Sequence, residues 1–247
     1  MTPLSSAVAT PTPELGSFLK DGIAVIFGSS GGIGGSLVAA LSSIGNSRQV
    51  TGFSRKTIPQ IDLLDEASLE RAATYAAEMG ALRLVIDATG FLHDDRQGPE
   101  KSWRQLDAGN LARAFALNAI GPALIMKHVL PRLPRTGKAV FATLSARVGS
   151  IGDNRLGGWY AYRASKAALN QLVRTAAVEL ARRTPEGICV ALHPGTVATS
   201  LSAPFSGAGL DVHTPDEASR HLLAVIDKLT VAANGGFFDW RGQPVPW

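Results

Sequence analysis

Short apolar segments alternate with longer helical segments along most of this 247-residue chain, and this alternation restricts the fold more than any single motif. The apolar segments do not alternate with polar residues, which is typical of strands that are buried on both faces. The sequence therefore predicts one doubly wound α/β domain of the Rossmann type, with a mostly or fully parallel sheet of about seven strands. The expected strands lie at 22–28, 48–54, 82–90, 138–145, 187–195 and 235–240, and the expected helices at 32–45, 65–80, 102–117, 118–133, 158–183 and 214–230.

The rest of the composition narrows the possible partners. Residues 1–20 are rich in Thr, Pro and Ser and predict a flexible tail before a single domain at 21–247. The net charge is only +4 and the basic residues are dispersed, so we expect no nucleic-acid partner. No segment approaches the about 20 apolar residues of a membrane span, and we expect a cytoplasmic protein with no membrane partner. The five histidines and Cys189 lack metal-ligand spacing, so no metal is assigned, and Cys189 is expected to be a core thiol.

A glycine-rich loop follows the first predicted strand, in the stretch "FGSSGGIGG". Gly28, Gly32 and Gly34 mark a tight turn that opens a helix, where glycine lets the backbone approach a pyrophosphate closely. The free N–H groups of a helix N-terminus then attract the anion. The loop therefore predicts a dinucleotide site at the carboxyl ends of the strands.

The same residues also match the G-x-S-x-G pattern of serine hydrolases, which would make Ser30 a nucleophile. In that fold a second oxyanion donor comes from a loop upstream of the nucleophile. Only one strand is predicted before Ser30, so the upstream loop has no source. The dinucleotide interpretation is the stronger one.

The stretch "GGWYAYRASKAALNQ" holds two tyrosines and one lysine. Tyr162 and Lys166 are four residues apart and share one face of a helix, whereas Tyr160 and Lys166 do not. A free phenol has a pKa of about 10. A neighbouring ammonium favours the phenolate, so we expect Lys166 to lower the pKa of Tyr162 and allow proton exchange with a carbonyl or alcohol oxygen. A plain surface pair of Tyr and Lys is the alternative.

Together, these features resemble the classical short-chain dehydrogenase/reductase family over nearly the whole chain, from about Gly22 to Trp247. The glycine loop "GSSGGIG", the "YRASK" motif, the serine of "TLSARVGSIG", the asparagine of "LNAIGP" and the loop "HPGTVATSL" occur in the family's order. The stretch "GSIGDNRLGGWYAYRASKAALN" and the ending "FFDWRGQPVPW" are similar to the C-factor and Sniffer-type carbonyl reductases.

The resemblance implies roles for individual residues. Tyr162 would give or take the proton, Ser145 would orient the substrate oxygen, Lys166 would also bind the nicotinamide ribose, and Asn118 would hold a local helix distortion and a water that links Lys166 to solvent. Tyr160 is expected to form a wall of the substrate pocket. The residues expected to bind the cofactor are Gly28, Ser30, Gly32, Ile33, Gly34, Ser54, Arg55, Asp62, Leu63, Ala88, Thr89, Gly90, Tyr162, Lys166, Pro194, Gly195, Val197 and Thr199.

The end of the second strand, "GFSRKT", bears on which cofactor is used. Enzymes that prefer NAD usually carry an acid there to bind the ribose 2′-OH. This chain has Ser54 and Arg55 instead, and a guanidinium can bind a 2′-phosphate. Asp62 comes later and resembles the family's adenine-side aspartate. We therefore expect a preference for NADP(H), with NAD(H) as the alternative.

Two residues depart from the family pattern, and two segments are expected to border the substrate. Asp87 stands where the family often has asparagine, which should alter local hydrogen bonding, and Phe27 replaces the usual threonine. Residues 201–215 are expected to form a mobile lid and 91–103 the opposite rim of the pocket.

The sequence thus predicts an oxidoreductase that transfers a hydride between a nicotinamide and a small carbonyl or alcohol substrate. The alternative is a dinucleotide-binding signalling or regulatory protein with little turnover. The resemblance also implies a partner: relatives commonly form dimers or tetramers through helices equivalent to those near 102–133 and 158–183, and monomers occur, so a homodimer or homotetramer and a monomer are the alternatives.

Overall fold

A six-stranded parallel sheet forms the centre of the protein in the computed structural model, which describes residues 13–18, 21–44, 49–96, 98–205 and 211–247. The strands run in the order β2-β1-β3-β4-β5-β8. This arrangement confirms the predicted doubly wound α/β fold, with six strands in place of about seven. The strand bounds are β1 Gly22–Phe27, β2 Gln49–Phe53, β3 Ala81–Asp87, β4 Ala139–Leu144, β5 Gly187–His193 and β8 Phe237–Asp239.

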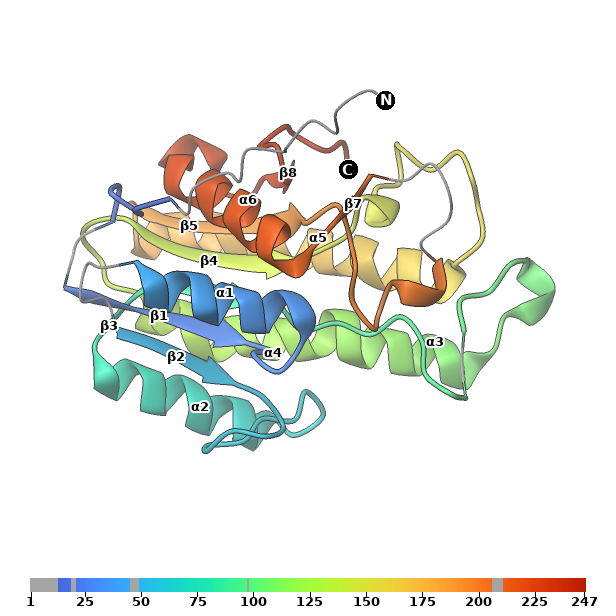
Figure 1. Ribbon diagram of the computed structural model, residues 1–247, viewed down its shortest axis with the longest axis horizontal. Coiled ribbons are helices and arrows are strands. Elements are labelled where there is room, and N and C mark those ends of the chain that lie inside the picture. The colour runs from blue at the N-terminus through green and yellow to red at the C-terminus, as the bar shows by residue number, and fades with distance from the viewer. Residues whose placement is uncertain (1–12, 19–20, 45–48, 97, 206–210) are drawn as a thin grey trace, which may run out of the picture.

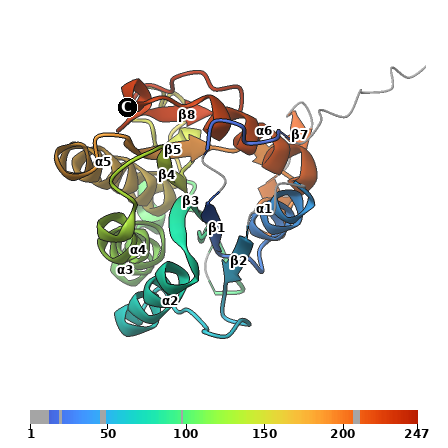
Figure 2. The ribbon, with the colours of Figure 1, turned by 90° about the vertical axis from the view of Figure 1, so that its left-hand side faces the viewer.

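Helices cover both faces of the sheet, as the end-on view in Figure 2 shows. Helices α1 and α6 pack on one face, and α2, α3, α4 and α5 lie on the other (Figures 1 and 2). Each face has its own cluster of buried apolar side chains. Cys189 is buried in one of them, as expected of a core thiol. The helix bounds are α1 Gly32–Ser43, α2 Glu66–Met79, α3 Ala108–Phe115, α4 Gly121–Val129, α5 Tyr160–Arg183 and α6 Pro215–Lys228.

The two helices expected at 102–117 and 118–133 differ from the prediction. They form one helical run from Ala108 to Arg132, in which a π-helical turn, Ala116–Ile120, joins α3 to α4. By length and apolar composition this run could cross a membrane, but half of its most apolar window is buried inside the fold. A short pair of strands was also not expected: β6 (Thr196–Val197) pairs with β7 (Val212–His213).

The described part of the N-terminal segment packs against the domain. Leu15 and Phe18 are buried in the cluster beneath α6. The Ser17 hydroxyl donates to the Asp227 carboxylate at 2.6 Å. Residues 13–18 of the predicted tail are therefore packed on the domain, because Leu15 and Phe18 contribute to its core. Residues 1–12 and 19–20 lie outside the described residues.

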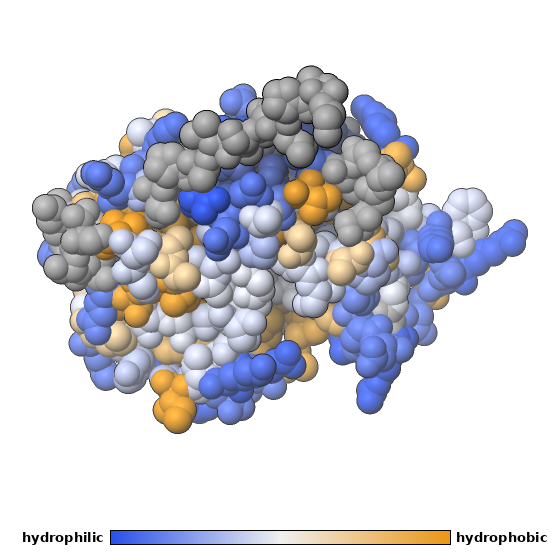
Figure 3. Space-filling view, viewed as in Figure 1, coloured by the Kyte–Doolittle hydropathy of each residue, from blue (hydrophilic) through white to orange (hydrophobic). Residues whose placement is uncertain are grey.

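The strand order determines where a ligand can bind. The chain crosses from β2 on one side of β1 to β3 on the other, so the order reverses beside β1. In open α/β sheets, ligands bind at such a reversal, outside the carboxyl ends of the strands. The surface is hollowed beside the end at which α1 begins (Figure 3).

Candidate active site

The loops that carry the predicted site residues all follow the carboxyl ends of parallel strands. Gly28 follows β1, Ala88 follows β3, Ser145 follows β4 and Pro194 follows β5. Because these strands are parallel and hydrogen-bonded neighbours, the four loops share one edge of the sheet. The structure therefore brings together segments that are far apart in the sequence.

The glycine loop allows backbones to approach closely. Gly28 has a φ of +83°, and a Cβ added to it would lie 2.9 Å from the carbonyl carbon of Ala88. A Cβ added to Gly34 would lie 2.2 Å from the Gly28 carbonyl oxygen, so α1 can start against β1 only with glycine there. Gly32 instead faces the loop after β5, since its added Cβ would lie 2.8 Å from Thr199 Cγ2.

The N-terminus of α1 is open to an anion. Its N-cap residue, Gly31, makes no side-chain cap hydrogen bond, and its first turn has no acidic residue. The first N–H groups of a helix have no partner within the helix, so an uncapped N-terminus fits a phosphate. Ser30 is exposed and Ile33 is half-buried in this turn. Within the described residues, Ser30 makes no hydrogen bond to a His or Asp, which argues against a hydrolase nucleophile.

Asp87 is completely buried at the end of β3. Its carboxylate accepts hydrogen bonds from the Thr89 N–H at 3.0 Å, the Thr89 hydroxyl at 2.6 Å and the Thr143 hydroxyl at 2.7 Å. Burial raises the pKa of Asp87, and these donors and Lys166 oppose the rise. The sequence predicted that Asp87 alters local hydrogen bonding. In the structure its carboxylate holds the loop at 88–90 through both donors of Thr89.

Asn118 lies in the π-helical turn, at the local helix distortion that the family resemblance implies. Its amide is buried, and it pairs with the backbone of Phe91 in both directions, at 2.7 and 2.8 Å. Its Nδ2 also donates to the Ser165 hydroxyl at 3.1 Å. Asn118 thus connects the loop after β3 to α5. The π turn supplies the extra residue that directs this side chain inward.

Lys166 extends from α5 to the same point. Its Nζ donates to the Leu144 carbonyl at 2.8 Å, immediately before Ser145. A Cβ added to Gly90 would lie 3.7 Å from Lys166 Nζ and 3.8 Å from Asn118 Oδ1, so both groups converge beside Gly90. Burial lowers the pKa of Lys166 to about 8, and the charge of Asp87 opposes this effect.

Tyr162 lies one helical turn before Lys166 on α5, and Lys166 Nζ is 5.9 Å from the centroid of its ring. Burial raises the pKa of the Tyr162 phenol to about 12. The net pKa of the phenol is therefore raised in the structure and not lowered, contrary to the expectation. The cause is that the ammonium is directed to the Leu144 carbonyl, while desolvation of the phenol dominates.

A buried glutamate positions the start of α5. Glu100, from the segment expected to form a rim, accepts a hydrogen bond from the Ala161 N–H at 3.1 Å and is 3% exposed. It performs the role of a helix cap from a distant part of the chain. Tyr160 is the first residue of α5 and is half-buried. Glu100 therefore holds the turn from which Tyr162 projects.

Aromatic side chains join the two segments expected to border the substrate. Phe205 packs edge-on against His93 at 5.3 Å and against Trp159 at 5.1 Å between ring centroids. Trp159 in turn lies 6.1 Å from the Tyr162 ring. The described parts of 91–103 and 201–215 thus meet over Tyr162, while residues 206–210 lie outside the described residues.

The loop after β5 packs back on the glycine loop. Gly195 has a φ of +82°, and a Cβ added there would lie 2.9 Å from His213 Cδ2 and 3.0 Å from Trp240 Cδ1. Val197 lies in β6, and the next residue is anchored by the His213 carbonyl at 2.8 Å. Of the residues expected to bind the cofactor in this loop, Thr199 is the one that approaches the glycine loop, at Gly32.

The residues expected at the adenosine end are spread around the end of β2. Ser54 is buried and its hydroxyl accepts from the Lys56 N–H at 3.1 Å, while Arg55 is exposed. The Asp62 carboxylate accepts from the Leu64 N–H at 2.9 Å. Leu63 packs against Gly121, whose added Cβ would lie 2.8 Å from Leu63 Cβ.

Sequence reasoning did not identify four side chains of this region: His93, Glu100, Trp159 and Phe205. Their contacts join distant segments, so no local spacing indicates them. Asn170 was also missed, although it follows Lys166 by four residues on the same helix face. Ser145 is buried, and its hydroxyl donates to Asn170 Oδ1 at 2.7 Å.

Comparisons with known proteins agree with this geometry. The model of a family described as enoyl-(acyl carrier protein) reductase matches residues 35–225. The chain is 41% identical over 143 residues to "C-signal" of Myxococcus xanthus, covering 58% of this chain and 81% of that protein. It is 34% identical over 191 residues to 1-hydroxy-2-glutathionyl-2-methyl-3-butene dehydrogenase of Rhodococcus sp. (strain AD45), covering 76% of this chain and 79% of the relative.

Solved structures show the same fold. Carbonyl reductase Sniffer of D. melanogaster superposes with a TM-score of 0.78 at 23% identity, over 91% of this chain and 99% of that one. An NADPH-bound carbonyl reductase from chicken fatty liver gives a TM-score of 0.77 at 26% identity, over 91% and 98% of the two chains. The chain belongs to the short-chain dehydrogenase/reductase family of oxidoreductases, in the subgroup that resembles C-factor and Sniffer-type proteins.

Proposed function

We propose that this protein reduces a small carbonyl compound with NADPH, or oxidises the corresponding alcohol with NADP. The observation that carries the proposal is the convergence of three side chains at the end of β4. Ser145 follows Leu144, Lys166 Nζ binds the Leu144 carbonyl, and Tyr162 lies one turn away on the same helix face. The same convergence supports the proposed domain limits, in which residues 21–247 act as a single catalytic domain.

The cofactor, when bound, supplies the hydride. The chain's own residues handle the proton and the orientation of the substrate. Because burial raises the pKa of Tyr162 to about 12, the phenol is protonated at neutral pH and is ready to donate to a carbonyl oxygen. Ser145 holds that oxygen, and the ammonium of Lys166 favours the developing phenolate. These roles suit reduction better than oxidation near neutral pH.

The open end of α1 supports a dinucleotide, and Arg55 supports NADP(H). Gly28 and Gly34 allow the backbone to approach a pyrophosphate, and the uncapped N-terminus offers N–H groups to it. Arg55 is exposed beyond β2 and has no ion pair with a described residue, so its guanidinium is free to bind a 2′-phosphate. The chicken relative was solved with NADPH bound.

The apolar wall formed by Trp159 and Phe205 supports a small hydrophobic carbonyl compound as substrate. The test is to mix the purified protein with NADPH and a panel of aldehydes, ketones and quinones and follow the near-ultraviolet absorbance of NADPH. We expect oxidation with at least one apolar carbonyl compound, and slower turnover with NADH. Tight NADPH binding without turnover on any compound would contradict the proposal.

That contrary result would favour a second function. The 41% identity to "C-signal" of Myxococcus xanthus supports a dinucleotide-binding signalling protein with little turnover. Tyr162 and Lys166 distinguish the two functions, because a binding protein does not need a proton donor beside Ser145. If signalling is the function, replacement of Tyr162 should leave the protein's signalling activity in cells unchanged.

A second copy of the chain is the proposed partner besides the substrate. Helices α4 and α5 border a groove of about 470 Å³ that includes Met126, Leu130, Leu172 and Leu180. Leu172 on α5 is exposed at this groove, which supports a helix-to-helix dimer on this face. Sedimentation of the protein should give a dimer or tetramer, and a charged substitution at Leu172 should dissociate it. We also propose a cytoplasmic location, which suits the unpaired Cys189.

A further inference from the structure

Asn170 is the next member of the helix face that carries Tyr162 and Lys166. The three residues follow one another at intervals of four on α5, so they project to the same side of the helix. Asn170 is 3% exposed, and its Oδ1 accepts the hydrogen bond from the Ser145 hydroxyl at 2.7 Å. This buried contact joins residues that are 25 positions apart in the sequence.

The direction of this hydrogen bond limits what Ser145 can do. A serine hydroxyl has one proton, and it can accept while that proton is donated elsewhere. While the proton is donated to Asn170, Ser145 cannot donate it to a carbonyl oxygen of the substrate. If the amide is turned so that its NH₂ group faces Ser145, the hydroxyl accepts from Asn170 and its own proton becomes available.

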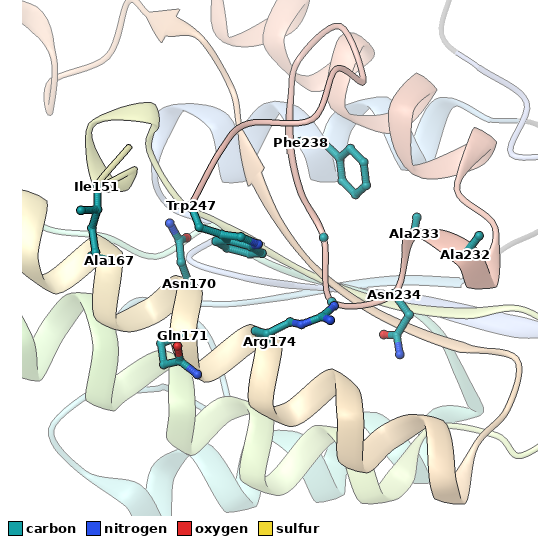
Figure 4. A pocket seen from close by; sticks show the side chains of 13 residues that line it. Ile151, Ala167, Asn170, Gln171, Arg174, Ala232, Ala233, Asn234, Phe238 and Trp247 are labelled. Carbon is teal, nitrogen blue, oxygen red and sulfur yellow. The ribbon is translucent and has the colours of Figure 1, made fainter. Parts of the chain in front are cut away.

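The other end of the amide leaves room for this exchange. Nδ2 of Asn170 is buried and has no hydrogen-bond partner among the described residues. The two ends of an asparagine amide are nearly identical in shape, so a rotation exchanges a donor for an acceptor without a change in packing. Figure 4 shows Asn170 beside Trp247 in a pocket of about 570 Å³, which Gln171 and Arg174 of α5 also line.

We propose that Asn170 is a positioning residue for Ser145. It holds the hydroxyl at the end of β4, and the orientation of its amide determines whether Ser145 donates to a carbonyl oxygen or accepts from an alcohol. In carbonyl reduction the NH₂ group faces Ser145, and in alcohol oxidation the amide oxygen does. This inference rests on the proposed function and assigns it a residue beyond Ser145, Tyr162 and Lys166.

The test compares two substitutions of similar size. Asn170→Asp keeps the shape, but an ionised carboxylate can only accept, so it captures the Ser145 proton. We expect carbonyl reduction by this variant to fall by about tenfold to a hundredfold at neutral pH and to recover as the pH is lowered and the carboxyl is protonated. Asn170→Leu should be slow at every pH. Gln171→Leu, at the exposed next position of α5, is the matched control and should resemble the unmodified protein.

A double-mutant cycle separates positioning from packing. If Asn170 acts through Ser145, then Ser145→Ala combined with Asn170→Leu should be no slower than Ser145→Ala alone. Affinity for NADPH and the melting temperature of each variant show that the fold is retained. If Asn170→Leu does not fold, the pH profile of Asn170→Asp decides the question.

The contrary results are distinct. A folded Asn170→Leu protein with the kcat of the unmodified protein, an Asn170→Asp variant with no new pH dependence, or a double variant slowed by the product of the two single effects would overturn this inference alone. An unmodified protein that turns over no carbonyl compound would overturn the proposed function and this inference together.

Discussion

Helices α1 and α6 pack side by side on one face of the sheet but begin in opposite ways (Figure 2). In α6, the Thr214 hydroxyl accepts from the Glu217 N–H at 3.2 Å, and the Glu217 carboxylate accepts from the Thr214 N–H at 2.8 Å. In α1, Gly31 makes no side-chain cap and the first turn has no acid. Side chains of α6 and its N-cap residue therefore bind the free N–H groups of that helix, whereas no side chain caps α1.

The two N-termini lie close together in space, so position does not explain the difference. A Cβ added to Gly32 would lie 3.6 Å from Pro215 Cγ, in the first turn of α6. A negatively charged side chain at the start of α1 would compete with a phosphate for the same N–H groups. We propose that the cap of α6 serves stability and that the uncapped N-terminus of α1 serves to bind the cofactor.

The largest effect is expected for Gly32→Val. A branched side chain there occupies the space in front of the open N-terminus, so affinity for NADPH should fall by at least about a hundredfold, equivalent to about 2.8 kcal/mol. The fold should persist, because the nearest atoms to the added Cβ belong to the side chains of Thr199 and Pro215 and none of them is backbone. Titration of NADPH against protein fluorescence measures the affinity. Gly35→Ala is the control, since its added Cβ would lie 3.4 Å from the nearest atom. Undiminished affinity in folded Gly32→Val protein would move the ligand away from α1.

Arg55→Ala should have the next largest effect. The guanidinium is expected to bind the 2′-phosphate of a ligand whose pyrophosphate lies at α1, so affinity for NADPH should fall by about tenfold, equivalent to about 1.4 kcal/mol. Affinity for NADH should be nearly unchanged. Lys56→Ala, at the exposed neighbouring position, controls for a general loss of positive charge. Equal affinity of the unmodified protein for the two cofactors, titrated at one salt concentration, is the result that would refute this assignment.

A smaller effect is expected in the pH dependence of kcat/KM for reduction. Burial lowers the pKa of Lys166 to about 8, so the ammonium loses its proton above that pH and reduction should slow, while Tyr162 stays protonated. Asp87 opposes the lowering. Asp87→Asn removes this opposing charge, so the pKa of Lys166 should fall further and the decline should begin at a lower pH. A decline at an unchanged pH would show that Lys166 is not the group responsible.

The smallest effect is expected at the closed helix. Thr214→Ala removes the cap of α6 and should cost about 1 kcal/mol of stability, which lowers the melting temperature by about 2–4 °C. Affinity for NADPH should stay the same, because none of the residues expected to bind the cofactor belongs to α6. Thermal unfolding and cofactor titration of the same preparation give both values. A loss of affinity comparable to that of Gly32→Val would remove the distinction between the two helices.

Most of the fold could be predicted because it depends on patterns that are local in the sequence. Strands such as Ala139–Leu144 are largely apolar runs, and the long helix Tyr160–Arg183 buries apolar residues such as Leu169 and Val173 along one side. The hydrophobic pattern did not predict the continuous helical run through Ala116–Ile120, because a π turn differs from an α-helix by a single inserted residue. Only the family resemblance implied a helix distortion at Asn118. The pair β6 and β7 has two residues in each strand, which is too short for a pattern.

The candidate site was predicted less completely for a physical reason. The positions of Gly28, Ser145, Tyr162 and Lys166 follow from motifs, but the pKa of Tyr162 depends on how deeply the phenol is buried. The spacing of Tyr162 and Lys166 predicted a lowered pKa, but the burial that raises it depends on side chains from other parts of the fold. Contacts such as Ser145 with Asn170 join separate elements, and only the folded chain brings them together.

The central claim is that Tyr162 transfers the proton and that Tyr160 does not, although both lie in the first turn of α5. The direct measurement is the rate of NADPH oxidation with one carbonyl substrate for the unmodified protein, Tyr162→Phe and Tyr160→Phe, with NADPH affinity determined for each. We expect Tyr162→Phe to bind NADPH normally and to lose about a hundredfold to ten-thousandfold in kcat, while Tyr160→Phe changes it by less than about tenfold. Equal losses in the two variants, or a larger loss in Tyr160→Phe, would contradict the account.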